Sequence, residues 1–339
     1  MNDAAPLLLQ EAEIPGLVWA YRFDAEGLAT PLGAIEEAEL DRIDAGYVWL
    51  HFNLADMRAC RWIAAAERIP AIARAFLLGK DTHQQLRVEG EYLCGAFADI
   101  EVELERLTDR VGRVLVVLGP RFLISGRRAP LRGVHAARAL IDGGFLAPGS
   151  IALLESIVAN AADAMGQSAT RLIAEIDDIE DRLLDDTVGD ERGRLGPIRR
   201  TAVRLHRQLL GVLSVLHRIE REGSLAAFPP QFAEAHSRLL QRIEALDHEV
   251  VVVQERARLM HDEIDAKLTR ETNRHLHTLT ILTTLFLPPT LLTGMWGMNL
   301  KAVPFADSEI GFWWAAVLCL ASSGLTYLFI RRLAKRRRR

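Results

Sequence analysis

The sequence predicts an α+β or α/β domain, then a stalk of long helices, then two C-terminal transmembrane helices. Two uncharged apolar segments lie near the end of the chain, and each reaches the roughly 20 residues that a helix needs to cross a bilayer. A heptad repeat of apolar residues precedes them, and runs rich in aromatic and β-branched residues occupy the first part. The expected divisions are an α/β domain (1–148), antiparallel long helices (149–228), a stalk helix (229–274), a first span (275–299), an external loop (300–309), a second span (310–330) and a basic tail (331–339).

The α/β domain shows strand and helix patterns in alternation. Strands are expected at 17–23, 47–52 and 92–97, a hairpin over 113–124 that turns at Gly119-Pro120, and helices near 34–42, 56–78 and 131–142. The sequence here contains no glycine-rich phosphate loop and no nucleophile motif. Nothing in the domain therefore indicates an enzyme or a resident cofactor.

Long helices follow this domain. One apolar face extends to about residue 186, and a second helix is expected over 198–222, because Gly196-Pro197 breaks the pattern between them. A third helix is expected over 231–297, about 100 Å long at 1.5 Å per residue. Pro288-Pro289 should kink this third helix within the membrane.

The heptad repeat lies in the third helix. Its apolar positions run from Leu239 to Ile264 with alternating spacings of four and three residues. This pattern fits a coiled-coil dimer, and it fits packing against the two preceding helices equally well. Both alternatives stay open from the sequence alone.

Charge predicts the orientation of the spans. Seven of the nine residues in the segment 331–339 are basic, and such residues beside a span are retained in the cytoplasm. Two spans return the chain to its starting side, so both termini are expected in the cytoplasm. Residues 1–299 carry 43 acidic and 33 basic side chains, which argues against a nucleic-acid partner.

A polar stripe follows one side of the first span. Its members are Asn273, Thr280, Thr283, Leu287, Thr290 and Gly294, spaced 7-3-4-3-4. One two-span chain cannot enclose a path for an ion, so conduction would require a symmetric ring of first spans, with Leu276 and Leu287 as hydrophobic constrictions. The alternative is that the threonines bond their own helix backbone and the small residues mediate helix packing.

Neither span contains a charged residue, so a dehydrated divalent cation would find no carboxylate partner in the membrane. The cation is therefore expected to keep much of its water and to be recognised through it by Asn and Thr side chains. His275 and His277 lie at the cytoplasmic mouth, where they are candidates for zinc binding or for titration near neutral pH. Their i, i+2 spacing points them to different helix faces.

The first span ends in Gly297-Met298-Asn299. In this position, before a second span and a basic tail, the tripeptide resembles the signature of the CorA metal-ion transporter superfamily. The resemblance implies a funnel-shaped CorA-like homopentamer with an αβα cytosolic domain, in a bacterial inner (plasma) membrane. It implies the following roles: a selectivity ring for the hydrated cation at Asn299, a turn shaped by Gly297 and Met298, an inner polar ring at Asn273, a ring below the entrance at Thr290, constrictions at Leu279 and Leu287, and attraction of cations by Asp307 and Glu309 in the external loop.

Three further segments resemble the ZntB-type zinc transporter branch of this superfamily, namely 17–23, 123–127 and 305–314. Magnesium-gated members of the superfamily carry a regulatory carboxylate on the stalk helix, approximately where this chain has Arg238. The expected function is transport of divalent metal ions, with Zn²⁺ as the first candidate and coupling to protons left open. The alternatives are a CorA-type Mg²⁺/Co²⁺/Ni²⁺ channel and, from another class, a membrane-anchored signalling or scaffold protein.

Overall fold

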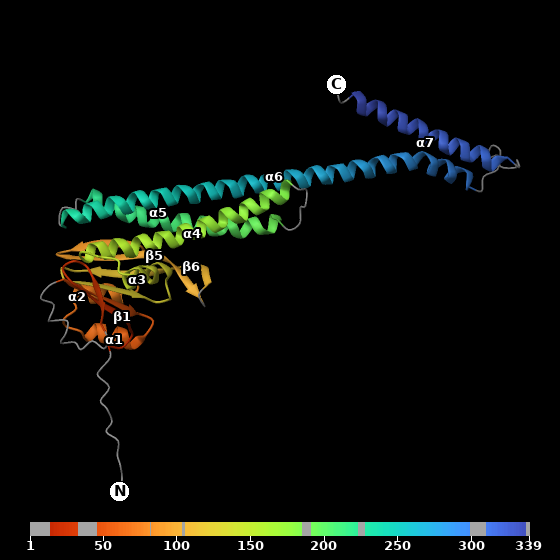
Figure 1. Ribbon diagram of the computed structural model, residues 1–339. Helices are drawn as coiled ribbons and strands as arrows, with labels where there is room; N and C mark the ends of the chain where they lie inside the picture. The colour runs from red at the N-terminus through yellow and green to blue at the C-terminus, as the bar shows by residue number, and fades with distance from the viewer. Residues whose placement is uncertain are drawn as a thin grey trace, which may run out of the picture. The chain divides into compact units, whose positions relative to one another are not determined.

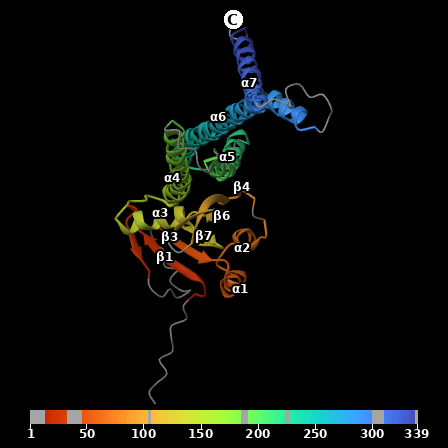
Figure 2. The same cartoon turned by 90° about the vertical axis from the view of Figure 1, so that its right-hand side faces the viewer.

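The computed structural model describes residues 14–32, 46–81, 83–103, 106–184, 191–222, 228–298 and 310–336. It divides into two compact units, Met1–Met260 and His261–Arg339. The helices labelled in Figures 1 and 2 are α1 Met57–Ala65, α2 Ala71–Leu78, α3 Arg132–Asp142, α4 Ser150–Leu184, α5 Glu191–Arg221, α6 Pro230–Trp296 and α7 Gly311–Arg336.

The first unit is built on a mixed β-sheet. Its strands are β1 Leu17–Phe23, β2 Ala29–Pro31, β3 Tyr47–Asn53, β4 Gln85–Glu89, β5 Tyr92–Glu103, β6 Arg106–Leu118 and β7 Phe122–Arg127. Within the part of the chain that the structure describes, they lie in the order β2-β1-β3-β7-β6-β5-β4. β3 and β7 are parallel, and the other neighbouring strands are antiparallel.

Helices cover both faces of this sheet (Figure 2). On one face, Ile63 of α1 and Leu77 of α2 pack in a core that also holds Cys94 and Ala96 of β5. The opposite face of β5 contacts α3 and α4. β5 is buried continuously from Leu93 to Ile100, as expected of a strand that is covered on both sides. The domain is therefore αβα, as the resemblance to the CorA superfamily implied.

A buried carboxylate joins the sheet to α3. Asp99 of β5 is fully buried and accepts hydrogen bonds from the backbone amides of Ile100 (2.7 Å), Gly133 (2.8 Å) and Val134 (3.1 Å). Two of these donors are free amides in the first turn of α3, where a negative charge is favourable. Burial nevertheless dominates, and it raises the pKa of Asp99 to about 6.

Ion pairs between the long helices of the first unit show the directions in which these helices run. Successive arginines of α6 pair with successive acidic residues of α4, which shows that α4 and α6 run in the same direction. These pairs are Arg238 with Glu155, Arg242 with Asp163, and Arg256 with both Asp177 and Glu180. α5 runs in the opposite direction, with His206 bonded to Asp247 of α6 and Gln254 of α6 donating to the carbonyl of Ala202.

The heptad repeat is buried within the single chain. The residues Leu239, Ile243, Val250, Val253, Ala257 and Met260 are all buried. The side chain of Leu246 packs against Gly166 of α4, where an added Cβ would lie only 2.8 Å from its Cδ2. Of the two alternatives for the repeat, packing against the preceding helices is confirmed.

Several sequence-based boundaries were wrong. α5 begins at Glu191 and contains Pro197, whereas the sequence predicted a break there and a start at 198. Leu195 and Ile198 are only 2% and 1% exposed, so the packing of these turns outweighs the cost of the proline. The single helix predicted over 56–78 is two helices, because Pro70 caps the start of α2 and restricts the residue before it to extended geometry.

The strands were predicted more accurately than these helix boundaries. β1, β3 and the start of β5 are confirmed, and the hairpin of β6 and β7 turns where Gly119 donates to the carbonyl of Phe122 (2.9 Å). β2 and β4 were not predicted. The helix expected near 34–42 falls outside the described residues.

Asp99 leads to a prediction on pH. Because the pKa of Asp99 in the folded protein lies above its ordinary 3.8, the folded state binds this proton more tightly than the unfolded chain does. The resulting stabilisation is full below pH about 4 and is lost as the pH rises through about 6. We expect the free energy of unfolding of wild type, relative to Asp99→Asn, to fall by on the order of 3 kcal/mol across this window. Denaturation of the full-length protein in detergent measures it, and a difference that does not change with pH would contradict the assignment.

Candidate functional site

Two helices in the described part of the chain are long and apolar enough to cross a membrane. They are the C-terminal part of α6 and the segment Gly311–Arg332 of α7, and neither apolar segment is buried within the chain. Large apolar side chains on both are exposed, for example Leu287 (63%) and Phe312 (75%). Contiguous apolar surface of this extent requires lipid or another copy of the protein to cover it.

α7 packs along one side of α6. The hydroxyl of Ser323 donates to the carbonyl of Leu285 (3.3 Å), and the thiol of Cys319 lies 3.9 Å from the carbonyl of Pro289. The half-buried residues of this part of α6 are Ile281, Leu285, Pro288, Pro289, Leu292 and Trp296. A helix turns by about 100° per residue, so these six lie within about 60° of Leu285. They form the α7-facing side of α6.

The polar stripe lies on the opposite side of α6. By the same helix geometry, Thr283, Leu287, Thr290 and Gly294 are rotated by roughly 140° to 180° from Leu285. All four are exposed and line one open groove of about 610 Å³. The other predicted pathway residues on this side of α6 are also exposed, namely Asn273, Leu276, Leu279 and Thr280. The structure therefore places the part of the stripe from Thr283 to Gly294 away from α7.

The threonine hydroxyls of the stripe bond to their own helix. Thr280 donates to the carbonyl of Leu276 (2.8 Å), Thr283 to that of Leu279 (2.9 Å) and Thr290 to that of Phe286 (2.7 Å). This confirms the backbone-bonding alternative for the threonines. It also has a chemical consequence, because a hydroxyl that donates its proton to a carbonyl keeps lone pairs that accept hydrogen bonds. The stripe thus offers neutral acceptors, which suit the protons of water.

The motif singled out by the sequence begins directly after the last residue of α6, Trp296. The amide of Gly297 donates to the carbonyl of Thr293 (2.9 Å), and the amide of Met298 donates to that of Met295 (3.3 Å). The second bond spans one residue fewer, which tightens the end of the helix. Asn299 lies outside the described residues, as do Asp307 and Glu309 of the external loop.

His275 and His277 are both exposed on α6. Two residues apart on a helix, they point in directions roughly 160° apart, so they do not form a pair of ligands for one ion. Among the described residues, no group of three or more His, Cys, Asp or Glu side chains is placed to hold a metal ion. A metal-binding role for either histidine stays a prediction.

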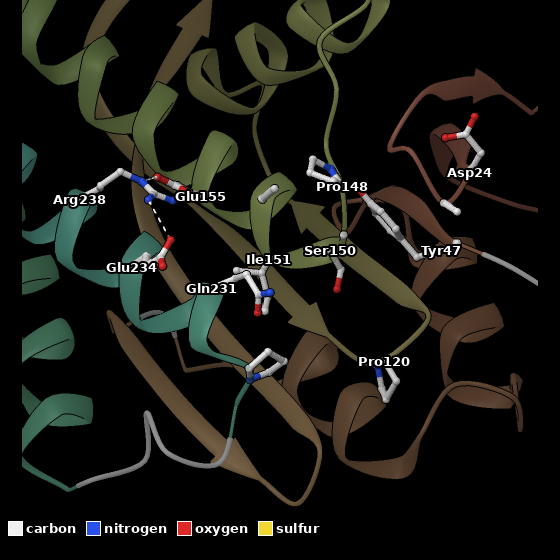
Figure 3. Close-up of a pocket in the computed structure, with 15 residues that line it drawn as sticks. Asp24, Tyr47, Pro120, Pro148, Ser150, Ile151, Glu155, Gln231, Glu234 and Arg238 are labelled. Carbon is white, nitrogen blue, oxygen red and sulfur yellow. Dashed lines mark hydrogen bonds and ion pairs between the residues drawn. The ribbon is translucent and has the colours of Figure 1, made fainter.

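Arg238 occupies the rim of a pocket of about 660 Å³ in the first unit (Figure 3). Its guanidinium donates to both carboxylate oxygens of Glu155 (2.6 and 2.7 Å) and lies 3.8 Å from Glu234. The hydrogen bonds to Glu155 raise the pKa of Arg238 above its ordinary value. Figure 3 shows the side chain directed at these two carboxylates, with Asp24 across the pocket. The charge of Glu155 is therefore neutralised from within the chain.

Sequence reasoning missed the side chains of α7 that contact α6. Cys319 and Ser323 are four residues apart, and therefore share one face of a helix. The available signal for this contact was a pair of weakly polar residues on one apolar span, in a chain whose other span contains two prolines.

Comparison with known proteins places this arrangement in a family. The model of the family described as CorA-like Mg²⁺ transporter protein matches residues 44–332. The zinc transport protein ZntB of Pectobacterium atrosepticum is 28% identical over 306 residues, which cover 89% of this chain and 91% of that protein.

Two solved structures share the fold. The full-length CmaX protein has a TM-score of 0.78 at 22% identity, covering 96% of this chain and 99% of its own. The CorA magnesium transporter from Methanocaldococcus jannaschii has a TM-score of 0.77 at 19% identity, covering 93% and 98% respectively. Since the family model spans most of the sequence, including both candidate spans, the chain belongs to the family of CorA-like Mg²⁺ transporter proteins.

Proposed function

We propose that this protein carries Zn²⁺ across a bacterial inner membrane, through a central pore lined by α6 in a homopentamer. Membership of the family makes the chain a transporter of divalent cations and not an enzyme. The choice of ion, the number of copies and the residues of the pathway are the parts proposed here.

The proposal rests on one observation, that α7 and the groove lie on opposite sides of α6. α7 contacts α6 around Leu285 and Pro289, and the groove that contains Thr283, Thr290 and Gly294 lies on the far side. In a closed ring of identical chains, an arrangement with α7 facing lipid turns this groove toward the axis. The stripe then lines the pore, and the exposed apolar surface of α7 meets the bilayer.

The chemistry of the stripe suits a cation that keeps its water. Water bound to a divalent ion is a strong hydrogen-bond donor, and the oxygens of Thr280, Thr283 and Thr290 have lone pairs to accept from it. Neither span offers a charged ligand to replace that water. Recognition through the hydration shell is the mode we propose, with Asn299 forming the outermost ring.

Two observations favour zinc over magnesium. One is the similarity to a zinc transport protein over nine-tenths of the chain. The other is Arg238, which pairs with Glu155 and stands approximately where magnesium-gated members of the superfamily carry a regulatory carboxylate. A CorA-type Mg²⁺, Co²⁺ or Ni²⁺ channel is the second candidate. A scaffold anchored by two spans would need neither the stripe nor the tripeptide.

The proposed topology follows from charge. The basic segment 331–339 lies directly after α7's apolar part, so the C-terminus is proposed to be cytoplasmic, and with two spans the N-terminus as well. His275 and His277 then lie at the inner mouth. Asp307 and Glu309 lie outside, where they would raise the local concentration of cations.

Uptake measurements test the choice of ion. In proteoliposomes we expect zinc uptake, and a change in its rate when a pH gradient is imposed would show the coupling to protons that the sequence leaves open. Zinc and magnesium are measured in parallel, with and without the gradient. Magnesium flux that ignores pH and stops when internal magnesium rises would overturn the zinc assignment in favour of the second candidate.

The role of the stripe is tested by removing one hydroxyl per chain. We expect Thr290→Val to reduce zinc uptake about three- to tenfold, since it preserves shape but removes an acceptor worth on the order of 1 kcal/mol. Thr278→Val is the matched control, because Thr278 makes the same kind of backbone bond (3.0 Å to Arg274) but lies off the stripe. Equal uptake by the two variants would remove the pathway role of Thr290.

The outermost ring is tested at Asn299. We expect Asn299→Ala to abolish or strongly impair metal flux, because an alanine offers no polar atom to the hydration shell. Size-exclusion chromatography should show an oligomer of unchanged size, which separates a selectivity role from assembly. Undiminished flux through an intact oligomer would exclude Asn299 from ion recognition.

A further inference from the structure

The double proline of α6 leaves a specific defect in the helix backbone. Proline has no amide proton, so Pro289 cannot donate to the carbonyl four residues earlier, which is that of Leu285. Inside a bilayer there is no water to take the place of this donor, and an unsatisfied carbonyl is costly. Figure 1 shows that α6 changes direction near its C-terminal end, as expected at a proline.

α7 supplies the missing donor. The hydroxyl of Ser323 lies 3.3 Å from the carbonyl of Leu285 and donates to it. One turn away on each helix, the thiol of Cys319 lies 3.9 Å from the carbonyl of Pro289. The two contacts repeat at the same four-residue interval on both helices, so they belong to one antiparallel register across the proline site.

The neighbouring hydroxyls of α7 behave differently. Ser322 donates to the carbonyl of Cys319 (2.8 Å), and Thr326 donates to that of Ser322 (2.8 Å), so both bonds stay within α7. Ser323, by contrast, donates across to α6. Its partner is the carbonyl that Pro289 deprives of an amide.

We infer that Ser323 is a positioning residue for the ion pathway. By satisfying the carbonyl of Leu285, it holds the bend of α6 in one orientation. The bend separates Thr280 and Thr283 on one side from Thr290 and Gly294 on the other, so its orientation sets how the two halves of the stripe align. This inference rests on the proposed function, because it assigns Ser323 to the alignment of that pathway.

The test is a cycle of variants in the full-length protein. Pro289→Ala restores an amide that can donate to the carbonyl of Leu285. The hydroxyl of Ser323 should then be unnecessary. We expect Ser323→Ala to reduce maximal zinc uptake about three- to tenfold in the wild-type background, and to have no further effect in the Pro289→Ala background. Ser323→Thr, which keeps the hydroxyl, should restore uptake.

Ser322→Ala is the matched control, because it removes a hydroxyl from the adjacent residue without touching α6. Hydrogen exchange of the α6 amides over 285–296 gives a second readout that does not depend on transport. Exchange should accelerate in Ser323→Ala, remain unchanged in Ser322→Ala, and show no additional acceleration when Ser323→Ala is added to Pro289→Ala.

The two readouts separate the possible failures. If the wild-type protein moves no metal, the proposed function fails, and hydrogen exchange still decides whether Ser323 holds the bend. Equal behaviour of Ser323→Ala and Ser322→Ala in exchange would overturn the inference. The inference would also be overturned if Ser323→Ala reduced zinc uptake equally in the wild-type and Pro289→Ala backgrounds. The effect of the substitution would then be unrelated to the carbonyl of Leu285.

Discussion

Within a bilayer there is no water to donate a hydrogen bond to a backbone carbonyl that has lost its amide partner. The packing of the C-terminal unit depends on this constraint. Pro289 removes the amide donor of the Leu285 carbonyl, and α7 brings the hydroxyl of Ser323 to that carbonyl. Because α7 occupies this side of α6, the groove lined by Thr283 and Thr290 is left facing away. The prolines thus lie on the side of α6 that meets α7, and the opposite side is the one proposed to line the ion pathway.

The threonines show that two interpretations of a sequence pattern can hold together. The sequence left two alternatives for the threonine hydroxyls, a bond to their own helix backbone or a place along an ion pathway. The bond from Thr290 to the carbonyl of Phe286 uses only the proton of the hydroxyl. The lone pairs stay available for water. An apolar span can therefore present a line of acceptors without an unsatisfied donor, which is compatible with passage of a hydrated cation.

How much the sequence could predict depended on the range of the interaction involved. Periodic burial was predicted well, so β1, β3, the start of β5 and the buried heptad positions of α6 were anticipated, whereas β2 and β4 were not. Boundaries set by tertiary packing were not, as Pro197 inside α5 shows. Contacts between distant segments, such as Arg238 with Glu155, have no local signature and required the structure. For Asn299 the sequence remains the source of its assignment, since the described residues end at Met298 before it.

The continuity of α6 has a consequence for how such a chain can vary. One helix of 67 residues contains both the heptad seam and the stripe, with no loop between them. Adding or deleting a single residue between Met260 and Asn273 would turn every later side chain by about 100° relative to the seam. Seven residues could be added with a phase error of only about 20°. We therefore expect substitutions in this segment to disturb the stripe less than the insertion or deletion of a single residue.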